Sequence, residues 1–227
     1  MAEVYGINMK DWGSEEIDKK LLNAVSKKRR EKIGRYYFTE DVKRSLYASV
    51  LVRYIACMKL ALTNDRIHIE ENCYGKPYLY GISNTYFNIS HSGEWVICAW
   101  SSREIGVDIE EVKECNLDIA KNYFCPSEFL YLLKQQESDK KGTFYDYWTL
   151  KESYIKFRGK GLSIPLNSFE LELNSEEVRL YSCEEGKPKF FRLQIDDRYK
   201  SAICTLDEEV KGLYEIPSEK VLNMLMK

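Results

Sequence analysis

The feature that most constrains the fold of this chain is an order of strand, helices and β-like runs that occurs in each half of its length. The first half opens with the strand-like run EVYGIN and continues with apolar residues at helical spacing over residues 14–32 and 39–62. It ends in three strand-like runs, RIHIE, TYFNIS and WVICAW. Thr39 is the predicted N-cap residue of the second helix.

The second half repeats this order more loosely, beginning with the run GVDIEEV. The short polar turn SSRE before it predicts a hairpin with WVICAW. Helical segments are predicted near 116–123, 126–136 and 143–157, followed by the runs SFELEL, EVRLYS, KFFRLQI and KSAICTL. We therefore predict an α+β fold of two similar lobes, residues 1–103 and 104–227, packed as one unit.

Composition narrows the class of protein. The chain has 227 residues, 44% of them apolar, and a net charge of −2, which is typical of a globular chain and argues against bulk nucleic-acid binding. It shows neither a signal peptide nor a run of membrane-spanning length, so we expect a soluble cytoplasmic protein with no membrane partner. Seven cysteines without C-x-x-C spacing favour free thiols, including Cys183.

Two carboxylates occupy one face of the strand-like stretch REIGVDIEEV, residues 103–112. Side chains alternate between the faces of a strand, so Asp108 and Glu110 share a face that Ile105, Val107 and Ile109 do not. A hard cation such as Mg²⁺ would cancel the repulsion between the two acids. An exposed face whose acids meet lysines of a neighbouring strand explains the pair as well, so both interpretations stay open.

A third carboxylate lies in YWTLKESYIKFRGKGLSIP. Glu152 and Lys156 are four residues apart and share one face of a predicted helix. Glu152 would complete a Mg²⁺ site beside the Asp-x-Glu pair, whereas the alternative is an ordinary surface pair. Gly159 and Gly161 bracket Lys160 in a basic loop that can approach a substrate closely.

Three further stretches are candidates for phosphate binding. In YGKPYL, Gly75 allows close backbone approach, Lys76 offers a charge and Pro77 fixes the turn. In FNISHSGEW, Ser90 and His91 are candidates for phosphate oxygens, although a surface turn and a hydrogen-bonded histidine are the simpler alternatives.

The third stretch is the basic run SKKRREK, residues 26–32. It contains Arg29 and Lys32, and Lys28, Lys32 and Arg35 line one helix face. The run is either a solvated helix end or an anchor for another phosphate. No nucleophilic triad around His91 is predicted.

Together these stretches resemble the surfactin-type 4′-phosphopantetheinyl transferases. The likeness covers nearly the whole chain, through YGI, REK…YYFTEDVKRSL, YGKPYL, FNISHSGEWVICAW, IGVDIEEV, NYFCPSEF and WTLKESYIKFRGKGLSIPL. The two signatures G-V-D-I-E and W-x-x-K-E-x-x-x-K are specific because they occur in this order about 40 residues apart.

The resemblance implies an enzyme that moves phosphopantetheine from coenzyme A to a serine of an acyl or peptidyl carrier protein and leaves adenosine 3′,5′-bisphosphate. It also implies two lobes related by a pseudo-two-fold axis, with the coenzyme in the cleft between them, and a monomer. The natural carrier and pathway stay open.

The resemblance further implies roles for individual residues. Asp108, Glu110 and Glu152 would hold Mg²⁺, with Glu152 also the candidate base for the serine proton, and Lys156 would neutralise developing charge. The residues expected to contact coenzyme A are Lys76, Pro77, Ser90, His91 and Lys156, with Tyr74 and Gly75 near the adenine and Arg29, Lys32 and Arg44 near the 3′-phosphate. His91 is also a candidate catalytic residue, and the role of Glu128 stays open.

The segment AKNYFCPSEF is a candidate docking surface for an acidic carrier, through Lys121, Tyr123 and Phe124. Core packing of the two aromatic residues is the alternative. Two other functions stay open beside the transferase: a non-catalytic module that binds coenzyme A or carrier, and a Mg²⁺-dependent phosphohydrolase that needs no carrier.

Overall fold

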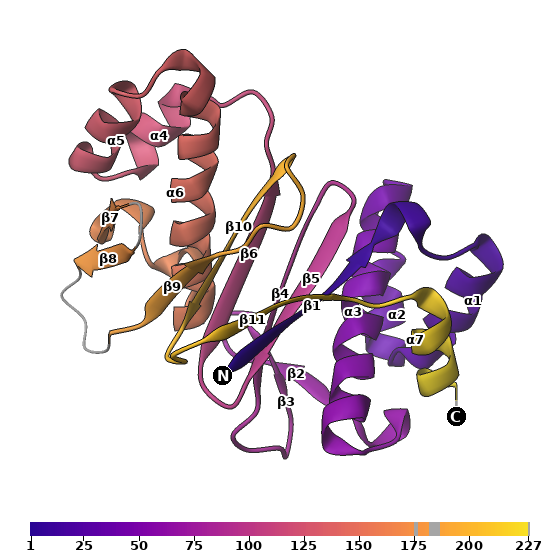
Figure 1. The fold of residues 1–227 in the computed structure, drawn as a ribbon. Helices are drawn as coiled ribbons and strands as arrows, with labels where there is room; N and C mark the ends of the chain where they lie inside the picture. Colours follow the sequence, from indigo (N-terminus) through magenta and orange to yellow (C-terminus); the bar gives the residue numbers. More distant parts are fainter. Residues whose placement is uncertain (175–176, 182–186, 227) are drawn as a thin grey trace.

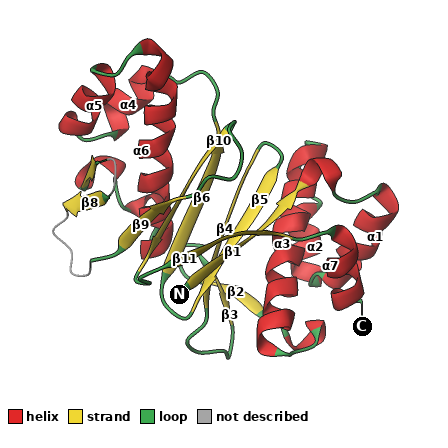
Figure 2. Ribbon diagram, viewed as in Figure 1, coloured by secondary structure: helices red, strands yellow, loops and turns green. Residues whose placement is uncertain are grey.

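The computed structural model describes residues 1–174, 177–181 and 187–226, and Figures 1 and 2 show its two α+β parts side by side. The strands are β1 (Ala2–Asn8), β2 (Ile69–Glu71), β3 (Pro77–Leu79), β4 (Tyr86–Ser92), β5 (Trp95–Ser101), β6 (Ile105–Glu111), β7 (Glu170–Leu173), β8 (Val178–Tyr181), β9 (Lys189–Arg192), β10 (Tyr199–Thr205) and β11 (Val210–Glu215). The helices are α1 (Glu15–Ala24), α2 (Lys27–Ile33), α3 (Thr39–Leu60), α4 (Leu117–Tyr123), α5 (Pro126–Leu133), α6 (Glu137–Arg158) and α7 (Ser218–Leu225). The predicted α+β class is confirmed.

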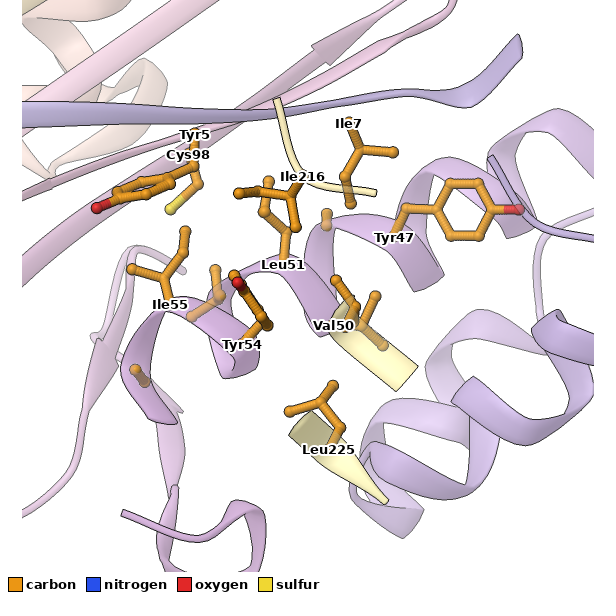
Figure 3. Packing of buried hydrophobic residues seen from close by; sticks show 14 of the residues in the cluster. Tyr5, Ile7, Tyr47, Val50, Leu51, Tyr54, Ile55, Cys98, Ile216 and Leu225 are labelled. Carbon is orange, nitrogen blue, oxygen red and sulfur yellow. The ribbon is translucent and has the colours of Figure 1, made fainter. Parts of the chain in front are cut away.

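The N-terminal part is a four-stranded sheet in the order β11-β1-β5-β4, packed against helix α3. Residues 45–57 of α3 are buried without interruption, so this helix is enclosed on all sides. Figure 3 shows Leu51 and Ile55 of α3 gathered with Ile7 of β1 and Leu225 of α7.

The end of the chain joins this N-terminal part, which the sequence pattern did not predict. Strand β11 pairs with β1 in parallel, and the indole nitrogen of Trp12 donates to the Ile216 carbonyl at 2.7 Å. Because β5 and β6 belong to different sheets, we keep a lobe boundary near residue 104 as a proposal. The segment 210–225 then crosses back to the first lobe (Figure 1).

The C-terminal part is a three-stranded antiparallel sheet in the order β6-β10-β9, with the long helix α6 against it. Helical spacing predicts an inward face of α6 made of Tyr147, Leu150, Tyr154 and Phe157. This face is confirmed, since the first three are buried in one apolar cluster and Phe157 is partly buried against it. On the other side of β6, Ile105, Val107 and Ile109 are fully buried, as the strand alternation predicts.

The predicted hairpin of WVICAW with GVDIEEV is wrong. Both edges of β5 are occupied, by β1 and by β4, so no edge is left for β6. The hairpin forms instead between β4 and β5, and β6 pairs with β10.

Three helix boundaries also differ from the prediction. Residues 14–32 form two helices, because the Ser26 hydroxyl accepts from the Arg29 backbone N–H at 3.3 Å and caps a new helix. Phe38, without a side-chain cap, is the N-cap residue of α3, so the N-cap role of Thr39 is wrong. Helix α6 begins six residues earlier than predicted, at Glu137, because its first turns are polar and lack the apolar spacing used to predict it.

No helix within residues 1–174, 177–181 and 187–226 is long and apolar enough to cross a membrane. Six cysteines are free thiols, and Cys183 lies outside the described residues.

Candidate active site

Gly106 brings helix α6 directly onto strand β6. A Cβ atom at this position would lie 2.1 Å from the Ser153 carbonyl oxygen and 2.2 Å from the Phe157 amide nitrogen. No side chain fits there without displacing the helix backbone. The glycine therefore sets the approach of Glu152 and Lys156, on α6, to the acids of β6.

Polar side chains of β4 join the two sheets at the point where β4 and β6 lie side by side. Asn88 accepts from the Val107 backbone N–H at 2.9 Å, Ser90 donates to Asp108 at 2.8 Å and Ser92 donates to Glu110 at 2.8 Å. Residue numbers rise along β4 and along β6 in the same order through these three contacts, so the two strands run in the same direction. The sequence motifs did not indicate the contacts of Asn88 and Ser92 with β6. Along β4 these two residues alternate with Ile89 and His91.

Asp108 is the centre of the candidate site. It is 2% exposed, and its Oδ1 accepts from Lys156 Nζ at 2.6 Å and from the Ser90 hydroxyl at 2.8 Å. Its Oδ2 is buried and has no hydrogen-bond partner among the residues that the structure describes. Lys156 thus pairs with Asp108, and the interpretation of Glu152 and Lys156 as an ordinary surface pair is wrong.

The surroundings of Glu110 and Glu152 disfavour the ionised form of each carboxyl group. Burial, then the charge of Asp108, raises the pKa of Glu110 to about 6, with a smaller contribution from Glu152. Burial and Asp108 also raise the pKa of Glu152, whereas Lys156 opposes that rise. The three carboxylates therefore influence one another electrostatically and carry more negative charge than Lys156 balances.

These residues fit a hard divalent cation by donor chemistry. Glu110 and Glu152 are partly buried carboxylates whose pKa values are raised by neighbouring acids, and together with the unpartnered Oδ2 of Asp108 they are what a cation would stabilise. Within the described part of the chain, however, no three His, Cys, Asp or Glu side chains are already arranged as metal ligands.

His91 lies on the opposite face of β4 from Ser90. Packing around the imidazole and the positive charges of Lys156 and Arg44 lower its pKa. Arg44 donates to the Gly93 carbonyl at 3.0 Å and to Asp41 at 2.9 Å, beside the β4–β5 turn. Arg44 does not line the cavity beside α2 and β2 that contains Arg29 and Lys32.

A cavity of about 400 Å³ opens beside α2 and β2. Its walls combine cationic side chains with apolar ones and with two acids, Glu70 and Glu71. The cationic and imidazole residues are Lys28, Arg29, Lys32, Arg53 and His68, and the apolar ones include Val52, Ile67, Ile69, Phe87 and Ile89.

Two of the predicted 3′-phosphate residues, Arg29 and Lys32, line this cavity. Arg29 donates to Ser49 at 2.7 Å and to the Ser45 hydroxyl at 3.0 Å, and Lys32 pairs with Glu71 at 3.1 Å. Arg53 and His68 also line the cavity, although no sequence motif indicated them as binding residues.

The turn of YGKPYL lies between this cavity and α6. Gly75 and Pro77 line the cavity and also a second hollow of about 300 Å³, which Tyr74, Glu152 and Lys156 line as well. Gly75 and Pro77 thus form a wall common to both hollows. The first hollow contains the cations of α2, and the second contains Glu152 of the site. A flat group can approach Gly75, whose φ is +88° and around whose Cβ position the space is open.

The ammonium group of Lys76 is hydrogen-bonded to three acceptors within the protein. Its Nζ donates to Glu104 at 3.0 Å, to the Ile105 carbonyl at 3.2 Å and to the Phe157 carbonyl at 3.0 Å. Its contact with coenzyme A stays a prediction, and binding there would have to compete with these three acceptors.

Glu128, whose role the sequence left open, belongs to a buried ion pair. Its Oε1 lies 2.8 Å from Lys151 Nζ and accepts from the Leu171 backbone N–H, while Oε2 accepts from the Cys125 backbone N–H at 2.7 Å. Both charged side chains are essentially inaccessible to water. Glu128 therefore joins α5, α6 and β7, and it is far more a structural residue than an exposed functional acid.

In the candidate docking segment, Tyr123 is half exposed and Lys121 is exposed, but Phe124 is only 3% exposed. Phe124 stacks on Phe144 inside the C-terminal core. The docking role of Phe124 is therefore wrong, and core packing is confirmed for it.

Comparison with known proteins is consistent with this site. Residues 10–103 match the model of the 4′-phosphopantetheinyl transferase N-terminal family, and residues 104–206 match that of the 4′-phosphopantetheinyl transferase superfamily. Over 204 residues the chain is 38% identical to 4′-phosphopantetheinyl transferase Sfp of Bacillus subtilis (strain 168) and 40% identical to 4′-phosphopantetheinyl transferase ffp of Bacillus subtilis. Each match covers 89% of this chain and 91% of the relative.

A third relative, 4′-phosphopantetheinyl transferase gsp of Aneurinibacillus migulanus, is 35% identical over 203 residues, which cover 87% of this chain and 85% of the relative. The fold and these matches define a group-transfer enzyme. The chain belongs to the 4′-phosphopantetheinyl transferase superfamily.

Proposed function

We propose that this enzyme transfers 4′-phosphopantetheine from coenzyme A to a serine hydroxyl of an acyl or peptidyl carrier protein, with Mg²⁺, and releases adenosine 3′,5′-bisphosphate. The observation that carries the proposal is the meeting of Glu152 and Lys156 of α6 with Asp108 of β6, at the end of a cleft that continues into a cation-lined cavity. This arrangement suits an extended anionic substrate with its reactive pyrophosphate at the acids.

Coenzyme A fits this cleft by charge and polarity. Arg29 and Lys32 would receive the 3′-phosphate in the larger cavity, and the apolar wall with Gly75 and Pro77 would receive the adenine. Tyr74, on the second hollow, extends that wall. Arg44 lies at the β4–β5 turn, which favours a contact near His91 over one with the 3′-phosphate.

In the proposed reaction, the serine oxygen forms a bond to the β-phosphorus and the bond from that phosphorus to the bridging oxygen of the pyrophosphate breaks. Glu152 would accept the serine proton, and its pKa, which burial and Asp108 raise, supports this role as base. Lys156 would stabilise the charge that develops on the leaving phosphate, and Ser90 would contact the phosphate oxygens beside it. His91, on the opposite face of β4, would contact another phosphate of coenzyme A.

Asp108, Glu110 and Glu152 would hold Mg²⁺ in this proposal. The cation would supply charge neutralisation at the pyrophosphate. We further propose that the enzyme is a cytoplasmic monomer and does not act on membranes. We also propose that it does not act on nucleic acid, which the near-neutral net charge of −2 supports.

The test of this function follows the nucleotide product by chromatography, with coenzyme A, Mg²⁺ and the enzyme, with and without an apo carrier. The proposal predicts adenosine 3′,5′-bisphosphate only when the carrier is present. Release without carrier would indicate a phosphohydrolase, and binding of coenzyme A without product would indicate a binding module.

Removal of divalent cations with EDTA is expected to abolish transfer, and added Mg²⁺ to restore it. Because Glu110 is predicted to be a ligand, Glu110→Gln should raise the Mg²⁺ concentration for half-maximal activity about 10-fold or more. Mg²⁺ should also raise the Tm of the wild-type protein but not of this variant. Glu111→Gln, on the same strand but paired with Lys113, is the control. Full activity in EDTA would refute the metal role.

Lys121 and Tyr123 remain the docking candidates, and exposed Leu130 of α5 joins them. Lys121→Glu and Tyr123→Ala are each expected to raise the KM for an acidic carrier about 10-fold, because they remove a cation and an aromatic anchor from the contact. The KM for coenzyme A should not change. Lys220→Glu on α7 makes the same charge change at a site on the N-terminal part. An unchanged carrier KM in both docking variants would exclude this surface.

A further inference from the structure

Asn72 is bonded to both parts of the molecule at once. Its side-chain Oδ1 accepts from the backbone N–H groups of Tyr74 and Lys76, each at 2.9 Å. Its Nδ2 donates to the Gly159 carbonyl at 2.9 Å, at the C-terminal end of α6. One amide side chain therefore folds the turn that lines the cleft and also fixes that turn to the helix that carries Glu152 and Lys156.

Lys76 and Gly159 strengthen the same connection. Lys76 donates to the Phe157 carbonyl at 3.0 Å, one turn after Glu152 on α6. Gly159 has a φ of +64°, and a Cβ there would lie 2.8 Å from Lys76 Cδ. The glycine thus ends the helix in the left-handed conformation and leaves room for the lysine stem. These contacts satisfy helix carbonyls that would otherwise lack donors.

This clasp, residues 72–76 together with the carbonyls of Phe157 and Gly159, determines where two walls of the cleft lie relative to each other. Gly75 and Pro77 form one wall, and Glu152 and Lys156 lie on the other. A substrate bound against the first wall can react only if its phosphorus lies at the right distance from the second. Displacements of about 1 Å in such sites cost up to about 100-fold in rate.

We propose that Asn72 is a positioning residue: through Gly159 it holds the coenzyme-binding turn in register with Glu152 and Lys156, without itself touching the reacting atoms. The inference rests on the proposed function. It predicts that loss of the Asn72 donor affects the rate of transfer much more than it affects the affinity for coenzyme A.

Asn72→Asp isolates this role, because the carboxylate keeps both acceptor contacts inside the turn but cannot donate to Gly159. We expect kcat to fall about 10-fold or more, with the Kd for coenzyme A by calorimetry changed less than about 3-fold. Asn72→Ala should lower kcat at least as much. Tyr78→Phe removes the Tyr78–Glu70 hydrogen bond of the same β2–β3 hairpin, away from α6, and should leave both values unchanged.

Hydrogen exchange gives a readout that is independent of transfer. Amides of residues 159–164 should exchange faster in Asn72→Asp and Asn72→Ala than in the wild-type protein and in Tyr78→Phe. A lower Tm with wild-type kcat in Asn72→Asp would mean that Asn72 is merely structural, and a large loss of coenzyme affinity at wild-type kcat would mean that it binds substrate; either result overturns the inference. Failure of the wild-type protein to transfer would instead refute the proposed function, and the inference with it.

Discussion

Asp108→Asn is expected to lower kcat/KM for transfer about 1000-fold or more, because it removes charge from the centre of the site. The carboxylate is almost fully buried, balances Lys156 at 2.6 Å and keeps one oxygen without a partner. An amide can still contact Ser90, but it neither balances the lysine nor offers an anionic oxygen to a cation. The side chain keeps its shape, so the fold should persist.

The measurement is steady-state kinetics at saturating Mg²⁺, together with Tm. We expect a Tm within a few degrees of the wild-type value. Glu208→Gln, an exposed acid after β10, is the control for loss of one negative charge and should retain full activity. A folded Asp108→Asn enzyme with more than about a tenth of wild-type kcat/KM would contradict the assigned role.

The second large effect is on stability, at the buried pair of Glu128 and Lys151. Lys151 Nζ donates to the carbonyls of Leu166 and Phe169, each at 2.8 Å, in addition to its contact with Glu128. Burial lowers the pKa of Lys151 and raises the pKa of Glu128, so each charge depends on the other. Lys151→Met would leave the buried Glu128 carboxylate without its opposite charge and would remove one donor from each of the two carbonyls.

We therefore expect Lys151→Met to lower the free energy of unfolding by about 3–5 kcal/mol. The measurement is denaturant unfolding, with Lys134→Met at the exposed end of α5 as the control. The double variant Glu128→Gln/Lys151→Met should be more stable than the sum of the single losses predicts, because no charge is left unpaired. A loss of less than about 1 kcal/mol in Lys151→Met would show that the pair is dispensable.

Local sequence pattern predicted most of the secondary structure and the faces that the key acids occupy. The alternation in REIGVDIEEV correctly placed Ile105, Val107 and Ile109 in the core and Asp108 and Glu110 on the other face. Helical spacing likewise predicted the buried face of α6. These features depend on neighbours in the chain, which a sequence displays directly.

Long-range pairing could not be predicted in the same way. Nothing in WVICAW indicates that β1 and β4 occupy both of its edges, and nothing after residue 206 indicated a return to the first sheet. The partners of Lys156, Lys76 and Glu128 likewise come from distant elements. Asn72 carried no motif signal, because its hydrogen bond to Gly159 exists only once α6 packs beside the turn, whereas its other two hydrogen bonds lie within the turn.

The central claim is transfer of a phosphopantetheinyl group to a carrier, and intact-mass spectrometry of the carrier tests it most directly. An apo carrier protein is incubated with this enzyme, coenzyme A and Mg²⁺, and the reaction is repeated with the Asp108→Asn variant. We predict that the carrier gains the mass of one phosphopantetheinyl group with the wild-type enzyme and none with the variant. An unchanged mass across several acyl and peptidyl carriers, with a folded wild-type enzyme, would contradict the account.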